Sequence, residues 1–305
     1  MAEKSSRPDE ELKVLGKNKI NQNLDVYIWD MDETLILLNS LLKESYAEAF
    51  NGLKDVQKGV EIGRMWEKLI LQLCDDYFFY EQIENYNKPF LDILNQYDDG
   101  RDLSDYDFNQ DGLGAPHDDD NKRKLAYRHR VIAQKYILGL KNLLDQETLK
   151  LWDQLYETTD AYTDSWLSSD SSVALPETSA NSTNMTHRHL NVLVTSGSLI
   201  PTLVKCMLFR IDNLITHENI YSSWDVGKVQ CFRWIKERFD LPNVRFCVIG
   251  DGWEECEAAK IMKWPFVKID PRPGTPYRFP GLTLRTVSHY FSVVYGSLND
   301  ENDEE

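Results

Sequence analysis

The pattern of hydrophobic and polar positions divides the chain into a helical part and an α/β part. Residues 24–29 form a short run rich in β-branched and aromatic side chains, which predicts a buried strand. From about residue 40 to 160, apolar residues recur every three to four positions, as at Met65, Leu69 and Leu73. This spacing predicts long amphipathic helices, so the first strand is expected to lead into a helical insert.

Beyond the helical part, strand-like and helix-like patterns alternate. A Ser/Thr-rich connector over 168–184 separates the two parts, and an acidic loop over 98–120 interrupts the helices. We expect strands at 192–194, 245–249 and 266–269, and helices at 199–209, 228–239 and 254–262. This alternation predicts an α/β fold with a parallel sheet covered on both faces.

The predicted organisation is one α/β core with a large insertion after its first strand. In chain order we expect a flexible N-terminus (1–23), the core in two pieces (24–39 and 186–296), a helical cap insert that carries the acidic loop and the connector (40–185), and an acidic tail (297–305). A hydrophobic fraction of 42% supports a folded core rather than a disordered chain.

Charge and cysteine content restrict the function class and the compartment. The 305 residues have a net charge of −16, which argues against direct nucleic-acid binding or attachment to an anionic membrane. An anionic substrate stays compatible, because a bound divalent cation reverses the local charge. Residues 1–11 lack the apolar centre of a signal peptide, and the five cysteines form no C-x-x-C pair. We therefore expect an intracellular protein of the cytoplasm or nucleus with reduced thiols.

Polar residues follow the predicted strands at the places where ligands of such sheets bind. Asp30 and Asp32 follow the first strand, Thr195 follows the second, Lys228 opens a helix, and Asp251 follows a later strand. Each residue alone is more often a turn or cap residue. All of them together, each at the end of a strand or the start of a helix, predict an active site.

These residue types suit phosphoryl transfer. A phosphate ester repels a carboxylate, so a hard cation must lie between them, and Asp30 and Asp251 are candidate ligands for it. Lys228 and Thr195 are candidates to hold the phosphate oxygens. Asp32 is placed to protonate the leaving oxygen. We expect Asp30, Asp32 and Asp251 to be buried together, an arrangement that is unfavourable without a metal.

The motifs resemble those of the haloacid dehalogenase superfamily and, more narrowly, the Eyes absent family of protein tyrosine phosphatases. The resemblance is carried by WDMDETL at 29–35, NSLL at 39–42, LIP at 199–201, ENIYSS at 218–223, GK at 227–228 and GDGWEE at 250–255. It extends over most of residues 24–295. It implies a haloacid dehalogenase-like Rossmannoid sheet, with the helical insert as a cap over the site.

The resemblance also implies roles for individual residues. Asp30 would be the nucleophile and Asp32 the general acid and base. Mg²⁺ would be held by Asp30, the main-chain carbonyl of Asp32, and Asp251, with Glu255 supporting the metal site. Thr195 and Lys228 become phosphate ligands. The implied substrate is a phosphotyrosine-containing protein, and transcription factors are partners that the family suggests.

Two departures separate this chain from animal members of the family. Those carry a long Ser/Thr/Pro/Tyr-rich activation segment where this sequence has residues 1–23, and 195–198 reads TSGS rather than a run of threonines. We expect a plant-type member. Two alternatives remain open at this stage: a phosphatase of small metabolites with the same fold, and an interaction or transcriptional coactivator module with incidental catalysis.

Three further features suggest other chemistry. Residues 107–112 read DFNQDG, like the start of an EF-hand calcium loop, but Gly114 and Pro116 interrupt the second half, and we predict a solvated acidic loop. An arginine does not follow any cysteine by six positions, which excludes thiol-dependent phosphatase chemistry and leaves the cysteines as core residues. Trp253 is predicted to be a core residue, with a place beside the substrate as the alternative.

Overall fold

A computed structural model describes residues 23–169, 187–279 and 284–296. Its centre is a parallel five-stranded sheet in the order β3-β2-β1-β4-β5. The strands are β1 (Asn23–Trp29), β2 (His187–Thr195), β3 (Ile220–Ser222), β4 (Val244–Gly250) and β5 (Phe266–Lys268). The first strand in the sequence is thus the middle strand of the sheet.

Side chains of β1 point alternately to the two faces of the sheet, and both faces are buried. Tyr27 and Trp29 contribute to one hydrophobic cluster, and Val26 and Ile28 contribute to the other. All four side chains are almost fully buried. This arrangement explains why the segment is a continuous apolar run rather than an alternating one.

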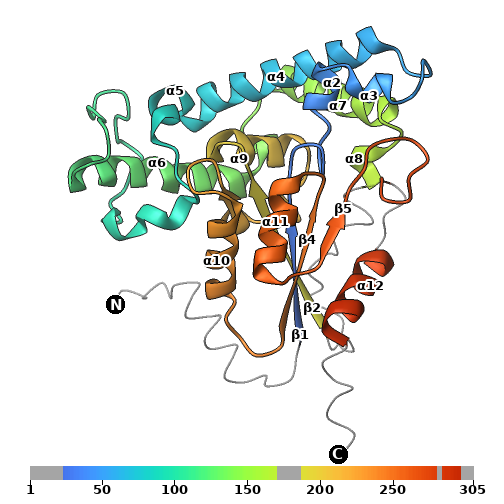
Figure 1. Ribbon diagram of the computed structural model, residues 1–305. Coiled ribbons are helices and arrows are strands. Elements are labelled where there is room, and N and C mark those ends of the chain that lie inside the picture. Colours follow the sequence, from blue (N-terminus) through green and yellow to red (C-terminus); the bar gives the residue numbers. More distant parts are fainter. Residues whose placement is uncertain (1–22, 170–186, 280–283, 297–305) are drawn as a thin grey trace, which may run out of the picture.

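Helices of the core cover both faces of the sheet. They are α9 (Leu199–Leu208), α10 (Lys228–Arg238), α11 (Trp253–Met262) and α12 (Leu284–Tyr295). Residues of α10 and α11 pack with Val26 and Ile28, while residues of α9 and α12 belong to the cluster that contains Tyr27 and Trp29. In Figure 1, α10 and α11 lie side by side against the sheet.

The helices between β1 and β2 form the cap. Its α-helices are α2 (Asn39–Leu42), α3 (Ser45–Glu48), α4 (Val56–Phe78), α5 (Tyr80–Ile83), α6 (Asp119–Leu138), α7 (Gln146–Tyr162) and α8 (Trp166–Ser169). Its short 3-10 helices are η1 (Glu84–Tyr86), η2 (Leu91–Tyr97) and η3 (Leu140–Asn142), and another, η5 (His217–Asn219), precedes β3 in the core. The cap lies above the carboxyl ends of the strands (Figure 1).

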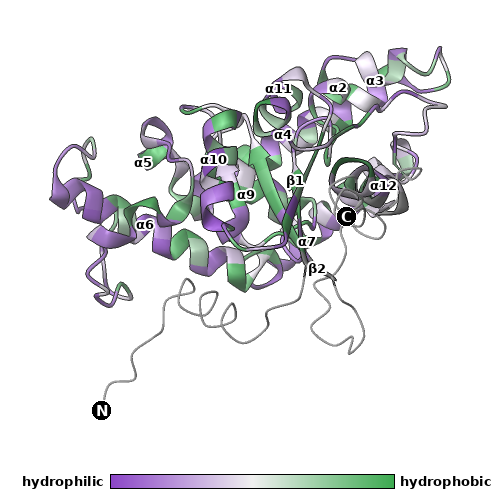
Figure 2. Cartoon of the chain, turned by 60° about the horizontal axis from the view of Figure 1, so that its bottom comes forward, coloured by the Kyte–Doolittle hydropathy of each residue, from purple (hydrophilic) through white to green (hydrophobic). Residues whose placement is uncertain are grey.

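Aromatic side chains join the cap to the core through α9. Trp66 of α4 packs against Phe209 with 4.3 Å between ring centroids, and Trp152 of α7 donates a hydrogen bond of 2.7 Å to the Leu208 carbonyl. Residues of α4, α7 and α9 share one hydrophobic cluster. Figure 2 shows hydrophobic residues along the strands and many hydrophilic residues along α6.

The predicted fold class, an α/β parallel sheet with an inserted helical cap, is confirmed. The predicted strands and helices of the core all form, with bounds that shift by a few residues, whereas β3 and α12 were not predicted. Asn23, expected to belong to the flexible N-terminus, begins β1. The rest of that segment (1–22), the acidic tail and most of the Ser/Thr-rich connector lie outside the described residues. All five cysteines are free, and four of them are buried. In the ranges that the structure describes, helices are too short or too polar to cross a membrane.

Candidate active site

Asp30 lies at the carboxyl end of the central strand. Its backbone N–H donates to the Ile249 carbonyl at 2.9 Å, which ties it to β4. The chain then makes a tight turn, in which the Met31 carbonyl accepts from the N–H groups of Leu35 and Ile36 at 2.8 and 3.1 Å. Glu33 adopts a positive φ of 62° within this turn. The turn thus holds Asp30 with its side chain at the sheet edge that the cap covers.

Lys228 provides the positive charge next to Asp30. Its Nζ lies 2.6 Å from Asp30 Oδ1 and 2.6 Å from Glu255 Oε2. Lys228 is the first residue of α10, and Gly227, the residue before the helix, has a φ of 79°. The Lys228 side chain is only 5% exposed. One buried ammonium group is therefore shared by two buried carboxylates.

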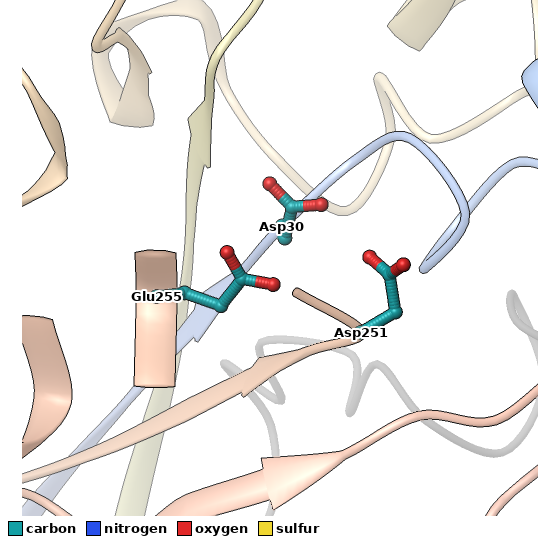
Figure 3. Close-up of side chains that lie close together, drawn as sticks. All are labelled: Asp30, Asp251 and Glu255. Atoms are coloured by element: carbon teal, nitrogen blue, oxygen red, sulfur yellow. The ribbon is translucent and has the colours of Figure 1, made fainter. Parts of the chain in front are cut away.

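Asp251 completes a group of three carboxylates with Asp30 and Glu255. One oxygen of each lies within 4.8 Å of the others, and Figure 3 shows the three side chains converging from the ends of β1 and β4 and from α11. The Thr34 hydroxyl lies between two of them, 3.4 Å from Asp30 Oδ2 and 3.3 Å from Asp251 Oδ1. A hydroxyl has one proton and donates to only one of these oxygens at a time.

Glycines allow Glu255 to reach this position. A Cβ atom on Gly250 would lie 2.6 Å from Glu255 Oε1, and one on Gly252 would lie 2.9 Å from it. Oε1 also accepts the Gly252 N–H, so Glu255 closes the first turn of α11 while its other oxygen binds Lys228. The G-D-G-x-E-E sequence is thus a requirement of packing as well as of charge.

The carboxylate cluster has less positive than negative charge. Burial is the main cause that raises the pKa of Asp30 to about 7, and the carboxylates of Glu255 and Asp251 add to the rise despite Lys228. Burial, followed by Glu255, also raises the pKa of Asp251. For Lys228, burial alone would lower the pKa, but Asp30 and Glu255 raise it above its ordinary value. The ammonium group stays charged and compensates for one of the three carboxylates.

A divalent cation fits this group of residues. The donor atoms are all carboxylate oxygens, the ligands that hard cations such as Mg²⁺ prefer. An added cation would also remove the repulsion that raises the pKa values of Asp30 and Asp251. Asp30, Asp251 and Glu255 are the side chains that would hold the ion.

Asp32 lies apart from this group. Its carboxylate pairs with Lys205 of α9 at 2.7 Å and is 25% exposed. The expectation that its side chain is buried with Asp30 and Asp251 is therefore wrong, because the carboxylate pairs with Lys205 and stays partly exposed. The third carboxylate of the cluster is Glu255 instead. The role of Asp32 in proton transfer stays a prediction.

Thr195 ends β2, the strand next to β1. Leu193 pairs with Trp29, so Thr195 lies beside the beginning of the Asp30 turn. Its hydroxyl oxygen accepts the Gly197 N–H at 3.1 Å, and its carbonyl accepts from the backbone and the hydroxyl of Ser223 at 2.8 and 3.0 Å. Of the predicted phosphate ligands, Thr195 thus ends a strand and Lys228 begins a helix. Both lie at the sheet edge that carries Asp30.

Sequence reasoning missed several residues of this region. Lys205 is the one charged residue in an otherwise apolar helix segment, LIPTLVKCML, which was an available signal. Thr34 is the last residue of the D-x-D-x-T motif, but the motif alone did not predict its contacts with Asp30 and Asp251. Trp253 begins α11, two residues after Asp251, and Trp224 lies in the loop before Lys228. Their exposed fractions are 73% and 66%, so the prediction of Trp253 as a core residue is wrong.

The acidic loop of the cap differs from its prediction at Asp111. Asp111 is not solvated: its side chain is 5% exposed and pairs with Arg128 through two bonds of 2.7 and 3.1 Å. Asp107 is exposed and accepts the N–H of Asn109, and Asp118 caps the first turn of α6. The side chains that imitate a calcium loop are thus used for a buried ion pair and for turns.

Comparisons with known proteins support one family. The chain is 58% identical over 289 residues to Protein phosphatase EYA of Arabidopsis thaliana, covering 92% of this chain and 94% of the relative. It is 36% identical to human Protein phosphatase EYA2 and 35% identical to Protein phosphatase eya of Drosophila melanogaster, over 83% and 80% of this chain. The matches cover 48% of the human relative and 33% of the fly relative.

Two other comparisons add little. No protein-family model matches the chain. A solved haloacid dehalogenase-like family hydrolase from Xanthomonas campestris covers 93% of this chain and 97% of its own, with 12% identity and a TM-score of 0.37. A TM-score that low supports no conclusion about this chain.

Proposed function

Because the chain belongs to the Eyes absent family, whose fold is that of the haloacid dehalogenase superfamily, we propose that it is a Mg²⁺-dependent phosphatase of phosphotyrosine-containing proteins. The observation that carries the proposal is the charge imbalance at the end of β1. Three carboxylates gather around one ammonium group there, which pairs with two of them, at the sheet edge where ligands of such folds bind. A phosphate ester reaches a buried carboxylate only when positive charge surrounds both.

In this proposal Asp30 is the nucleophile. One carboxylate oxygen attacks phosphorus, and the bond from phosphorus to the leaving oxygen breaks, which leaves an acyl phosphate on Asp30. The bond from Lys228 Nζ to Asp30 Oδ1, at 2.6 Å, orients this side chain. The hydroxyl of Thr34 donates to the same carboxylate or to Asp251.

Asp32 transfers the protons. It donates a proton to the leaving oxygen, and in the second step it accepts a proton from the water that attacks phosphorus, so that Asp30 and inorganic phosphate are released. Lys205, at 2.7 Å, fixes the position of the Asp32 carboxylate. Thr195 and Lys228 hold phosphate oxygens as charge spreads over them.

Mg²⁺, when held by Asp30, the main-chain carbonyl of Asp32 and Asp251, with Glu255 supporting the metal site, would supply the positive charge that balances the carboxylates. Phosphotyrosine is the proposed substrate through the family, and its phenol, with a pKa near 10, leaves with less help from an acid than an aliphatic hydroxyl needs. The two exposed tryptophans near the site offer aromatic surface to such a ring. Transcription factors are proposed partners through the family.

The test compares kcat/KM for phosphotyrosine, phosphoserine and phosphothreonine peptides and for sugar phosphates, with Mg²⁺ present. We expect phosphotyrosine to be hydrolysed far faster than the other substrates. Equal or faster hydrolysis of sugar phosphates would favour a phosphatase of small metabolites. Failure to hydrolyse any of these esters would favour a role as an interaction or coactivator module.

A further inference from the structure

A short segment of the cap, residues 87–90, crosses the two loops that carry the proposed phosphate ligands. The segment lies between η1 and η2, and we call it the strap. It runs beside the edge strand β3: the Pro89 carbonyl accepts the Ser222 N–H at 2.7 Å. Phe90 packs on Tyr221 and Trp234, with centroid distances of 5.5 and 5.7 Å. The strap is thus fixed to the core at its C-terminal end.

Asn87 makes hydrogen bonds from this strap to both loops. Its Oδ1 accepts the Leu199 N–H at 2.9 Å, at the start of the helix that follows Thr195. Its Nδ2 donates to Asp225 Oδ2 at 3.0 Å and to Ser222 Oγ at 3.4 Å, in the segment that leads to Lys228. One cap side chain therefore joins two core loops that are separate in the sequence.

The bond to Leu199 fills a gap in the capping of α9. The first N–H groups of a helix have no partner within the helix, and the preceding residue often supplies one. Ser198 occupies that position here but makes no side-chain capping bond. Asn87 supplies the acceptor from another part of the chain, which fixes where α9 begins relative to Thr195.

The bonds to Asp225 and Ser222 reach Thr195 and Lys228 through further contacts. The Ser222 hydroxyl donates to the Gly197 carbonyl at 2.7 Å, and Gly197 donates its N–H to the Thr195 hydroxyl. Asp225 lies within the turn that the Gly227 N–H closes on the Ser223 carbonyl at 2.8 Å, directly before Lys228. Movement of Asn87 would therefore displace both segments.

We propose that Asn87 is a positioning residue that sets the spacing between Thr195 and Lys228 and so links the cap to phosphate binding. The inference rests on the proposed function, because it takes these two residues as the phosphate ligands. An amide suits this place, since it accepts from one N–H and donates to a carboxylate at the same time. A carboxylate at position 87 would accept from Leu199 but would repel Asp225.

The test is a swap of the groups at positions 87 and 225. Asn87→Asp and Asn87→Ala should each raise KM for p-nitrophenyl phosphate and the inhibition constant of inorganic phosphate by about tenfold to a hundredfold, with a smaller change in kcat, because a displacement near 1 Å has effects of this size. Asp225→Asn alone should change little, because its amide oxygen can turn toward Asn87. The double variant Asn87→Asp/Asp225→Asn restores a donor and acceptor pair and should recover near wild-type values.

Asn142→Ala is the matched control, because Asn142 is a cap asparagine whose amide bonds only to the Leu138 carbonyl among the contacts found for it. It should leave KM and phosphate inhibition unchanged. Hydrogen exchange of the Leu199 amide, followed by mass spectrometry, should be faster in Asn87→Ala and not in Asn142→Ala. A double variant as impaired as Asn87→Asp, or an Asn87→Ala variant with wild-type phosphate inhibition, would overturn the inference.

An inactive wild-type protein would give a different outcome. If the wild-type protein hydrolyses none of the phosphate esters, the proposed function is refuted. The role of Asn87 in positioning phosphate ligands is then refuted as well. If the wild type is active and only the swap fails, the proposed function stands and the positioning role of Asn87 is refuted.

Discussion

Asp30 in the core and Asp111 in the cap are both buried carboxylates that pair with a cation, but their charge balances differ. Arg128 directs its five N–H donors at five acceptors: two oxygens of Asp111, the side-chain oxygen of Gln82, and the carbonyls of Phe108 and Lys124. In the core, Lys228 is one cation among three carboxylates.

The pKa values follow this difference. Burial would raise the pKa of Asp111, but Arg128 and the Tyr106 hydroxyl outweigh it and lower the pKa below its ordinary value. Burial raises the pKa of Asp30 to about 7, and the neighbouring carboxylates prevent Lys228 from reversing the shift. A balanced buried pair stabilises the fold, whereas an unbalanced group is poised to bind a cation and to react.

The largest effect is expected from Asp30→Asn. The change removes the proposed nucleophile and one metal ligand, so turnover of phosphotyrosine peptide should fall by several powers of ten. The free energy of unfolding should stay the same or rise, because an ionised carboxylate in this cluster is destabilised by burial. Steady-state kinetics and urea denaturation of the same preparation measure the two quantities. An Asp30→Asn protein that keeps wild-type turnover would remove the basis of the mechanism.

The opposite outcome is expected from Asp111→Asn. The change leaves the buried Arg128 without its counter-charge, and breaking such a pair lowers the free energy of unfolding by about 3–5 kcal/mol. Turnover per folded molecule should stay near the wild-type value, since Asp111 belongs to the cap loop. Urea denaturation gives the first quantity and active-site-normalised kinetics the second. An unchanged free energy of unfolding would contradict the claim that the Asp111–Arg128 pair stabilises the fold.

Lys228→Ala tests the positive side of the core cluster. The phosphate oxygens and Asp30 would lose their ammonium group, which should lower kcat/KM about a hundredfold, or roughly 3 kcal/mol of transition-state stabilisation. Cys206→Ser and Cys247→Ser serve as controls, because both thiols are buried and should influence stability only. A cysteine variant that is folded and inactive would contradict the assignment.

A smaller effect is expected from pH at His129 in the cap. Burial lowers its pKa from 6.5 to about 4, while its Nδ1 lies 2.9 Å from the Leu91 carbonyl. Between these two values the unfolded chain binds a proton that the folded chain does not, so stability falls as pH falls from 6.5 toward 4. The loss should be about 1–3 kcal/mol. His129→Gln should flatten this part of the curve of unfolding free energy against pH, and an unchanged slope would contradict the prediction.

Much of the core could be predicted because short sequence patterns determine its strands and the polar residues that follow them. Strands β1 and β4 are short apolar runs, and the polar residues directly after them lie at the sheet edge where the rule for parallel sheets puts ligands. β3 was missed because three residues carry little pattern. The spacing of Lys228 from Asp30 depends on the position of α10, which only the folded chain determines.

The missed features depend on contacts between distant residues. Asp32 and Lys205 are 173 positions apart, and Asn87 and Leu199 are 112 positions apart, so local patterns do not pair them. The DFNQDG segment by itself suggests calcium ligands, but Asp111 of this segment pairs with Arg128, which lies in the next helix. Glu255 was predicted to support the site, and the glycines that let it reach Lys228 are adjacent in the sequence.

The central claim is that the carboxylate cluster at the end of β1 needs an added cation to act on a phosphate ester. The most direct measurement is the initial rate of phosphotyrosine peptide hydrolysis by exhaustively chelated protein as Mg²⁺ is added back, with Asp251→Asn treated in parallel. We expect a negligible rate after chelation, recovery with Mg²⁺ in the wild type, and a much weaker recovery in Asp251→Asn, because one ligand is lost. Full activity after exhaustive chelation would contradict the account.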